Sequence, residues 1–268
     1  MLHLAAVFDW EIIGYDVQNA FVEGHLEEDI YMNLLKDIVT TEHNSPVKVK
    51  LNRNLYGLKQ AGHVWNQKLV KDLKTIGFTQ SIHDKCVFVY SDKERDVKVY
   101  CVTFVDDIIM TGNCINTIYV LGDKLSQYVL KLTQEKSLRR YIGLKIIHDR
   151  INHKIMLNQS TYIHKYLDKH KVTGKPKKTP ISSNYDYTKK GDNSRPPIYE
   201  KLGSMRYSAD HTRPDLLAAI GIISSGMANP LENDMHALKH IEQYLLHTSD
   251  LSLTLGGENT YVYLAFWL

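Results

Sequence analysis

Apolar residues recur along this chain with two periods, and the longer period predicts helices. Over residues 63–78 the apolar positions fall three or four residues apart with lysines between them, as in an amphipathic helix. These positions are Trp65, Leu69, Leu73 and Ile76. Helical segments are also expected over 2–8, 116–132, 160–172, 213–230 and 232–248. Ser160 is the expected N-cap of its helix, because a serine side chain can accept a hydrogen bond from a free backbone N–H there.

The shorter period, with its β-branched and aromatic residues, predicts strands. Residues 86–90 and 97–105 flank the polar segment SDKERD and are expected to form a hairpin. Strands and helices mix in the first 155 residues and helices dominate afterwards, which favours an α+β fold followed by a helical part. Residues 173–198 are rich in Pro, Gly, Ser and Lys, as in a linker. Further strands are expected over 11–17, 108–112, 141–147 and 154–158.

The composition limits the classes of protein that this chain can be. Its 268 residues, 43% of them hydrophobic, suit one large domain or two smaller ones. The net charge of +3 does not by itself predict a polyanionic partner. Cys86, Cys101 and Cys114 lack the spacing of a zinc site, and we expect reduced thiols in an intracellular protein. With no signal peptide and no apolar run near the ~20 residues of a membrane span, we expect neither secretion nor a membrane partner.

One stretch, CVTFVDDIIMTGN over 101–113, places two adjacent aspartates inside an apolar strand pattern. Asp106 and Asp107 would repel each other and lose hydration if they were buried there. One explanation is a hairpin turn, since aspartate is common in turns. The other is a metal site, where carboxylate oxygens suit Mg²⁺ and a pair of such ions supports displacement at phosphorus. Asp16, which ends the strand over 11–17, is the candidate third carboxylate, although it is equally suited to cap the segment that follows.

Three motifs resemble, in the same order, those of the Ty1/copia-type retrotransposon reverse transcriptases. They are YDVQNAFVEGHLEEDIYM, LNRNLYGLKQAGHVWNQ and YCVTFVDDIIMTGN. RYIGLKI resembles the primer-grip segment of that family, and TRPDLLAAI with HALKHIEQYLLHTSDLSLTL resembles its thumb and connection region. The resemblance covers residues 2–256, and five ordered segments are far more specific than any one motif.

The resemblance implies roles for single residues. Asp16, Asp106 and Asp107 match the family's catalytic aspartates. Together with the Val17 carbonyl they would hold two Mg²⁺ ions, with Mn²⁺ as an alternative. Phe21 matches the aromatic steric gate that excludes ribonucleotides. The other expected residues of the dNTP pocket are Asn19, Ala20 and Gln60.

The resemblance also implies an architecture, a right-hand polymerase palm whose antiparallel sheet carries the catalytic aspartates, with partial fingers and a helical thumb and connection. Residues 1–155 would be the palm with partial fingers, 156–198 the thumb helix and linker, and 199–256 the helical connection region. Residues 257–268 would be a truncated tail where RNase H begins. Three positions depart from the family pattern, with Gln18 in place of Lys, Gly62 in place of Pro and Phe104 in place of Tyr.

The implied function is that of an RNA-directed DNA polymerase, which extends a primer 3′-OH on an RNA or DNA template with dNTPs. Lysines around the expected thumb helix would contact template phosphates, or would simply form a solvated face. They are Lys165, Lys169, Lys171, Lys175, Lys177 and Lys178. The rest of the Pol polyprotein, with its integrase and RNase H, would be a further partner, in a cytoplasmic virus-like particle or in the nucleus.

Two other functions are compatible with the same residues. An inactive retrotransposon remnant would at most bind nucleic acid. A metal-dependent nuclease would use similar carboxylates, but it would not account for the motifs that contain Phe21 and Gln60.

Overall fold

The computed structural model describes residues 1–34, 48–185, 198–227 and 232–257. Its contacts divide the chain into two compact units, with the boundary between Leu138 and Arg139. We call residues 1–138 the first unit and the described residues from 139 onward the second unit. The fold is mixed, with antiparallel sheets and helices in both units. Most of the expected linker segment over 186–197 and all but the first residue of the expected tail over 257–268 lie outside the described residues.

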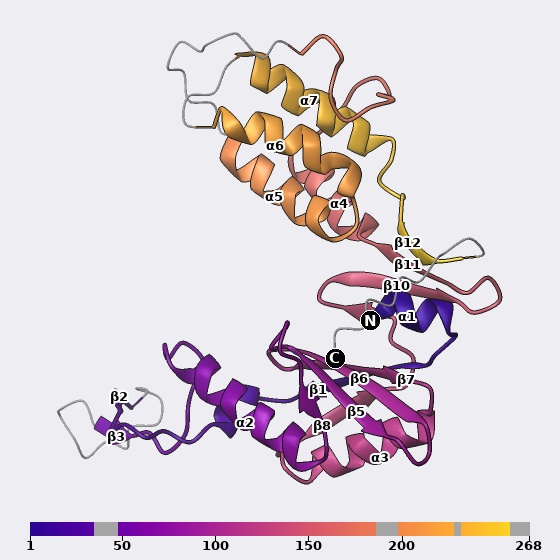
Figure 1. The fold of residues 1–268 in the computed structure, drawn as a ribbon. Helices are drawn as coiled ribbons and strands as arrows, with labels where there is room; N and C mark the ends of the chain where they lie inside the picture. Colours follow the sequence, from indigo (N-terminus) through magenta and orange to yellow (C-terminus); the bar gives the residue numbers. More distant parts are fainter. Residues whose placement is uncertain (35–47, 186–197, 228–231, 258–268) are drawn as a thin grey trace. The chain divides into compact units, whose positions relative to one another are not determined.

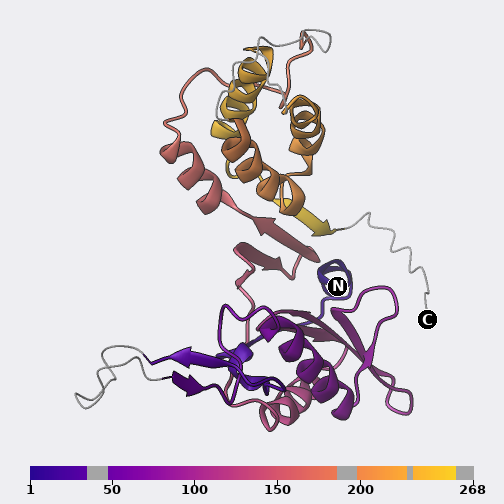
Figure 2. The same cartoon turned by 90° about the vertical axis from the view of Figure 1, so that its left-hand side faces the viewer.

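The first unit is built on a six-stranded sheet in which every pair of neighbouring strands is antiparallel. In spatial order its strands are β4 (Thr79–Gln80), β5 (Val87–Asp92), β6 (Val97–Phe104), β7 (Asp107–Gly112), β1 (Ile12–Val17) and β8 (Leu132–Glu135). The smaller elements of this unit are α1 (Leu2–Val7), the 3₁₀ turn η1 (Ala20–Glu23), β2 (Tyr31–Asn33) and β3 (Lys48–Lys50). The β2–β3 hairpin projects away from the sheet of its own unit in both views (Figures 1 and 2).

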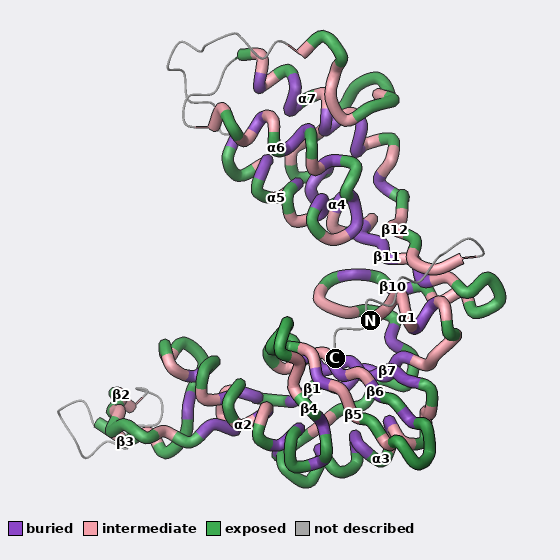
Figure 3. Tube along the Cα trace, viewed as in Figure 1, coloured by how far each residue is buried: buried purple, intermediate pink, exposed green. Residues whose placement is uncertain are grey.

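Two helices, α2 (Ala61–Thr75) and α3 (Ile115–Ser126), cover one face of this sheet. The expected apolar residues of α2 are buried with Ile118 and Leu121 of α3 against alternate residues of β1, β6 and β7. Figure 3 shows the buried positions along these strands and along the inner sides of the helices. Alternation along each strand places the remaining side chains on the opposite face. On that face Ile12 and Ile109 are buried, whereas Asp16 is exposed and Asp107 is partly exposed. The candidate chemistry lies at this open end of the face.

The second unit combines a small sheet with a helical bundle. Its four strands follow the order β12 (Leu253–Gly256), β11 (Lys154–Asn158), β10 (Leu144–Asp149) and β9 (Arg140–Tyr141). Its helices are α4 (Ser160–Lys169), α5 (Ile198–His211), α6 (Leu217–Ser225) and α7 (Glu232–Leu246), with a 3₁₀ turn η3 (Pro214–Leu216) before α6. These helices share a second hydrophobic core (Figure 2, salmon to yellow).

A buried arginine joins two parts of this bundle. Arg213 is almost fully buried and donates hydrogen bonds to the Asp215 carboxylate and to the Thr248 carbonyl oxygen. The Tyr244 hydroxyl donates to the same carboxylate at 2.8 Å. The charge is therefore paired and hydrogen-bonded, as a buried charge must be. The RPD segment of the sequence has a structural role in the second unit.

Two sequence expectations about helix ends were wrong. The helix expected over 116–132 ends at Ser126, because residues 132–135 instead form β8 and pair with β1. Ser160 is the first helical residue rather than the N-cap, which is Gln159. The Asn158 side chain accepts the hydrogen bond from the Ser160 backbone N–H at 2.8 Å.

Other elements were missed or displaced. Helix α5 and strand β12 were not expected, although α5 contributes Leu202 and Met205 to the second core. The helix expected from residue 213 begins as the 3₁₀ turn η3 and becomes α-helical at Leu217. None of the described helices has the length and the apolar run that crossing a bilayer requires.

Candidate active site

The two adjacent aspartates lie at the tip of the β6–β7 hairpin. Phe104 and Asp107 are the last paired residues, so Val105 and Asp106 form a two-residue turn. Val105 has a φ of 57°, which places a β-branched residue in the left-handed region. Such a conformation costs on the order of 1–3 kcal/mol and persists only where neighbouring structure holds it. The predicted hairpin is therefore confirmed, but its turn is Val105–Asp106 rather than the expected pair of aspartates, and Asp107 is the first residue of β7.

Asp16 lies beside this turn on the neighbouring strand. In the β1–β7 ladder Asp16 is directly opposite Asp107, and the preceding pair, Tyr15 and Ile108, faces the core. The alternation of side chains therefore puts both carboxylates on the face of the sheet opposite to α2 and α3, at the end where that face is open. The Val17 N–H donates to the Asp106 carbonyl oxygen at 3.0 Å, which ties the end of β1 to the turn. Asp16 is a strand residue here, and the N-cap of the following turn η1 is Asn19, so the capping alternative was wrong.

The three carboxylates influence one another electrostatically. Partial desolvation, followed by the negative charge of Asp106, raises the pKa of Asp16 above its usual range. Partial desolvation, followed by the charges of Asp106 and Asp16, likewise raises the pKa of Asp107. Like charges directly opposite in a ladder destabilise a sheet. This arrangement costs stability in the free protein, and a bound cation would remove that cost.

The described residues contain no group of three His, Cys, Asp or Glu side chains placed closely enough to hold a metal ion as they stand. The backbone brings Asp16 and Asp107 to paired positions with Asp106 next to them, but their side chains do not converge on one point. A metal site at these residues therefore stays a prediction.

The residues expected in the nucleotide pocket lie on η1 and at the start of α2. Asn19 has a left-handed φ of 57°, and Ala20 is buried in the core. Phe21 is half-buried and meets Tyr56 edge to face with ring centroids 4.7 Å apart. Gln60 is the N-cap residue of α2, and its side chain makes no capping hydrogen bond. A Cβ on Gly62 would lie 3.9 Å from the Phe21 ring, so Phe21 lies beside the first turn of α2.

One contact to the turn was not expected from the sequence. The Trp65 indole Nε1–H donates to the Val105 carbonyl oxygen at 2.6 Å. Sequence reasoning placed Trp65 on the apolar face of α2, but helical spacing carries no information about a partner 40 residues away. The contact links α2 to the turn that carries the aspartates.

A partly buried ionic cluster beside Trp65 was also missed. Lys68 on α2 donates to Asp72 at 2.8 Å and to the Tyr128 carbonyl oxygen at 2.6 Å. Glu23 is buried, lies 3.7 Å from Lys68 and accepts a hydrogen bond from the Leu130 N–H. The i,i+4 spacing of Lys68 and Asp72 was the available signal for their pairing. The cluster ties η1 and the segment after α3 to α2.

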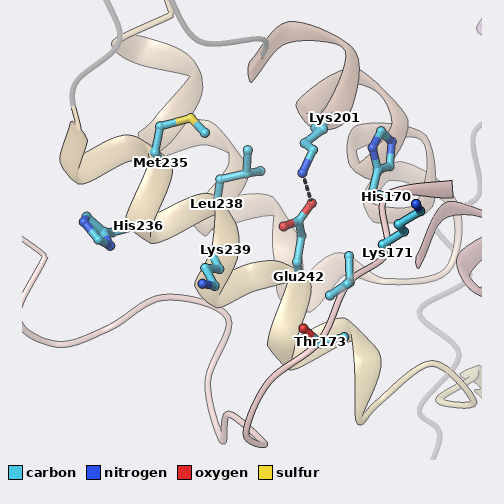
Figure 4. A pocket seen from close by; sticks show the side chains of 10 residues that line it. His170, Lys171, Thr173, Lys201, Met235, His236, Leu238, Lys239 and Glu242 are labelled. Atoms are coloured by element: carbon cyan, nitrogen blue, oxygen red, sulfur yellow. Dashed lines mark hydrogen bonds and ion pairs between the residues drawn. The ribbon is translucent and has the colours of Figure 1, made fainter. Parts of the chain in front are cut away.

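The second unit has a cavity of about 380 Å³ whose lining combines lysine and histidine side chains with apolar residues and one glutamate (Figure 4). Its buried acid, Glu242, is already paired with Lys201 and accepts a hydrogen bond from the Tyr166 hydroxyl. Lys171 follows α4 with a left-handed φ of 50°. Backbone N–H groups of Lys171 and Val172 close that helix end by bonding back to its last turn. The cationic or titratable lining residues are His170, Lys171, Lys201, His236 and Lys239.

Among the lysines expected to meet template phosphates, only Lys171 lines this cavity. Lys169 instead forms a salt bridge with Glu200 on α5. Lys165 is exposed on α4. The structure gives these lysines different surroundings rather than one continuous row.

Comparison with protein families gives one match, to "Reverse transcriptase (RNA-dependent DNA polymerase)", over residues 1–183. That range contains the β6–β7 hairpin, Asp16, η1 and α2.

Known proteins similar to the chain are Pol or Gag-Pol polyproteins of transposons. The chain is 30% identical over 269 residues to the Retrovirus-related Pol polyprotein from transposon TNT 1-94 of Nicotiana tabacum. The aligned region covers 97% of the chain and 20% of that relative. It is 34% identical over 267 residues to the Pol polyprotein from transposon RE1 of Arabidopsis thaliana, covering 97% of the chain and 18% of the relative. The transposon Ty1-BL Gag-Pol polyprotein of Saccharomyces cerevisiae is 22% identical over 271 residues, covering 94% of the chain and 15% of that protein.

The chain thus spans about a fifth of the length of the first two of these relatives. The family match covers more than half of the chain and contains the strands that carry the aspartates. The chain belongs to the reverse transcriptase family, in the form found in Ty1/copia-type retrotransposon Pol polyproteins.

Proposed function

We propose that this chain is an RNA-directed DNA polymerase that adds deoxynucleotides to a primer 3′-OH. The observation that carries the proposal is the pairing of Asp16 with Asp107 on the face of the sheet opposite to α2 and α3, with Asp106 in the adjoining turn. On this proposal residues 1–155 are a right-hand palm with partial fingers, of which the first unit makes up the larger part. The helices of the second unit are the thumb and connection. Family membership supports the proposed reaction, and the register of the sheet supports the choice of Asp16 and Asp107 as its catalytic residues.

The donor set fits a divalent cation. Asp16, Asp106 and Asp107 supply hard carboxylate oxygens, and their mutual repulsion favours a bound positive charge. These residues and the Val17 carbonyl would hold two Mg²⁺ ions, with Mn²⁺ as an alternative. Such ions, when bound, supply positive charge at the primer hydroxyl and at the triphosphate. The protein's own part is to hold its carboxylates at the end of a rigid hairpin and at the end of β1.

The incoming dNTP is assigned to the region between η1 and the start of α2. Phe21 is supported there by Tyr56 and by the first turn of α2. A ring held in this way can exclude a 2′ hydroxyl by occupying its space. The Gln60 side chain makes no capping hydrogen bond in α2, and its amide can donate to and accept from the nucleotide. Asn19 and Ala20 complete the wall of this pocket.

The proposed macromolecular partner is a primer annealed to an RNA or DNA template. The lysines around the cavity of the second unit provide charge for its phosphates. The rest of a Pol polyprotein, with integrase and RNase H, is the proposed protein partner. The proposed place of action is a cytoplasmic virus-like particle or the nucleus.

The test is extension of oligo(dT) on poly(rA) with dTTP, with and without Mg²⁺. We expect Mg²⁺-dependent extension that Asp106→Asn reduces at least ~100-fold, because transition-state charge stabilisation is a large part of such catalysis. In the same assay Phe21→Val should raise incorporation of rUTP relative to dTTP, whereas Tyr56→Phe, which keeps its ring, should not. Extension that Asp106→Asn leaves unchanged would contradict the proposal.

The alternative of an inactive remnant makes a different prediction in this experiment. A remnant would bind the primer–template in a salt-sensitive way and would extend nothing at any Mg²⁺ concentration. A nuclease would shorten the primer instead of extending it.

A further inference from the structure

The turn that carries Asp106 and leads into Asp107 is strained, and its own side chains do not hold it. Val105 has the left-handed φ of 57° and is 45% exposed, so packing of its side chain cannot fix the conformation. Phe104 before it is also exposed. Because strained turns persist only where other contacts determine them, the contacts of the turn's backbone decide where the aspartates lie.

Two hydrogen bonds reach that backbone from opposite sides. The Trp65 Nε1–H donates to the Val105 carbonyl oxygen at 2.6 Å, and the Val17 N–H donates to the Asp106 carbonyl oxygen at 3.0 Å. The second bond comes from β1, next to Asp16. The first comes from α2 and is made by a side chain that is 2% exposed. A hydrogen bond in a buried setting is stronger than in water, and an unpaired carbonyl there is costly.

Trp65 is itself held firmly. The Lys68 ammonium lies 5.9 Å from the centre of the Trp65 ring and is fixed by hydrogen bonds to Asp72 and to the Tyr128 carbonyl. The ring also belongs to the hydrophobic core of the first unit with Leu69 and Leu73. The donor therefore sits on a rigid element, which is what positioning a reactive group requires.

We propose that Trp65 is a positioning residue that fixes the turn between β6 and β7, and thereby sets where Asp106 and Asp107 lie relative to Asp16. It acts through the Val105 carbonyl and touches neither metal nor substrate. The consequence for metal binding rests on the proposed function, whereas the consequence for the turn does not. Through Trp65, the helix that Gln60 caps also controls the geometry of the aspartates.

The test is Trp65→Phe, which keeps an aromatic ring in the core and removes the N–H donor. Trp10→Phe is the matched control, because Trp10 stacks on Phe8 and Tyr100 and does not contact the turn. Hydrogen-exchange mass spectrometry on the whole chain should show amides of 104–108 exchanging about tenfold faster in Trp65→Phe, with the rest of α2 and β7 unchanged. No change at the turn, or an equal rise throughout the first unit, would overturn the proposal.

A second measurement follows the metal directly. Binding of Mn²⁺ to the free chain, measured by electron paramagnetic resonance, should weaken about 3- to 10-fold in Trp65→Phe and remain unchanged in Trp10→Phe. Equal Mn²⁺ affinity in the wild type and Trp65→Phe would overturn the proposed effect on the aspartates. A wild-type chain that binds no Mn²⁺ would instead contradict the proposed polymerase site, and the exchange experiment would still decide whether Trp65 holds the turn.

A measurement on the wild type guards against a variant that fails to fold. The Trp65 indole N–H should exchange with D₂O at least ~10-fold more slowly than the Trp10 indole N–H in NMR spectra, because a hydrogen-bonded N–H must open before it exchanges. Comparable exchange rates for the two indoles would overturn the proposed hydrogen bond.

Discussion

At the scale of single residues, the molecule places negative charges where a folded protein gains nothing from them. Asp16 and Asp107 face each other across a ladder, and partial desolvation and their neighbours' charges raise the pKa of both. A sheet selected only for stability would not pair like charges in this way. The strained backbone of Val105 in the adjoining turn also costs stability. Both features are explained if the site is arranged for a ligand that is absent from the free chain.

The raised pKa of Asp107 gives a prediction for stability against pH. A carboxyl whose folded-state pKa lies above its unfolded value lowers the stability at pH 7, and this penalty disappears as the pH falls through the folded pKa. Asp107→Asn should therefore raise the free energy of unfolding at pH 7, by ~0.5 kcal/mol after allowance for solvent screening. The gain should shrink as the pH approaches ~4. Urea unfolding at several pH values measures it.

Asp149 provides a control of opposite sign. Hydrogen bonds from the Asn152 side chain and backbone lower the pKa of Asp149. Its contribution is therefore favourable at neutral pH and is lost as the pH falls, so Asp149→Asn should destabilise at pH 7 and less so in acid. Loss of stability at pH 7 in Asp107→Asn would contradict the repulsion between Asp107 and its neighbours Asp106 and Asp16.

At the scale of elements, α2 joins the parts of the candidate site. Its N-cap is Gln60, the residue assigned to the nucleotide, and its first turn lies beside Phe21. Its Trp65 side chain donates a hydrogen bond to the turn between β6 and β7. Gly62 lowers the stability of this helix, because a glycine loses more backbone conformational entropy on folding than an alanine does.

Gly62→Ala should therefore stabilise the first unit by ~0.5–1 kcal/mol without loss of activity. The added Cβ meets only the Phe21 ring at 3.9 Å, an ordinary contact distance. Gly112→Ala is the contrasting variant, because its Cβ would lie 2.2 Å from the Lys98 carbonyl oxygen on the paired strand β6. It should destabilise by about 1–3 kcal/mol. Chemical unfolding compares the two, and equal effects would contradict the described packing.

How far the sequence predicts these elements depends on the range of the interactions that form them. The α2 helix and the β6–β7 hairpin were predicted because their signals, helical spacing and a polar turn between strands, are local. The pairing of β8 with β1 and the hydrogen bond from Trp65 were not, since both join segments distant in sequence. The position of Asp16 at the end of a strand made it a candidate third carboxylate, and the family resemblance gave it a role, but neither placed it in space. The sheet register then placed it opposite Asp107.

At the scale of the whole molecule, the described residues form two hydrophobic cores, one in each unit. The first unit carries the paired carboxylates, and the second carries a cavity lined in part by three lysines. A net charge of +3 gives no sign of this division, because a total charge does not show where the charges lie.

If the lysines that line the cavity bind phosphates, nucleic-acid binding should depend on salt through them. Lys171→Gln combined with Lys239→Gln should weaken binding of a primer–template to the whole chain. It should also reduce the slope of log K against log[salt] by about 0.7–0.9 for each phosphate that the variant no longer neutralises. The double variant Lys71→Gln with Lys74→Gln removes the same charge from exposed positions on α2 and should change the slope less. Fluorescence anisotropy at several salt concentrations measures this, and equal slopes for both variants would count against a phosphate site at the cavity.

The most direct test of the central claim is single-nucleotide incorporation by Asp16→Asn, measured beside its thermal unfolding. If Asp16 and Asp107 are paired for metal-dependent polymerisation, the rate of dTMP addition on poly(rA)/oligo(dT) falls at least ~100-fold. The melting temperature stays the same or rises, because a like-charge pair has been removed. A variant that keeps its rate within about threefold of the wild type, or that loses activity only because it unfolds, would contradict the account.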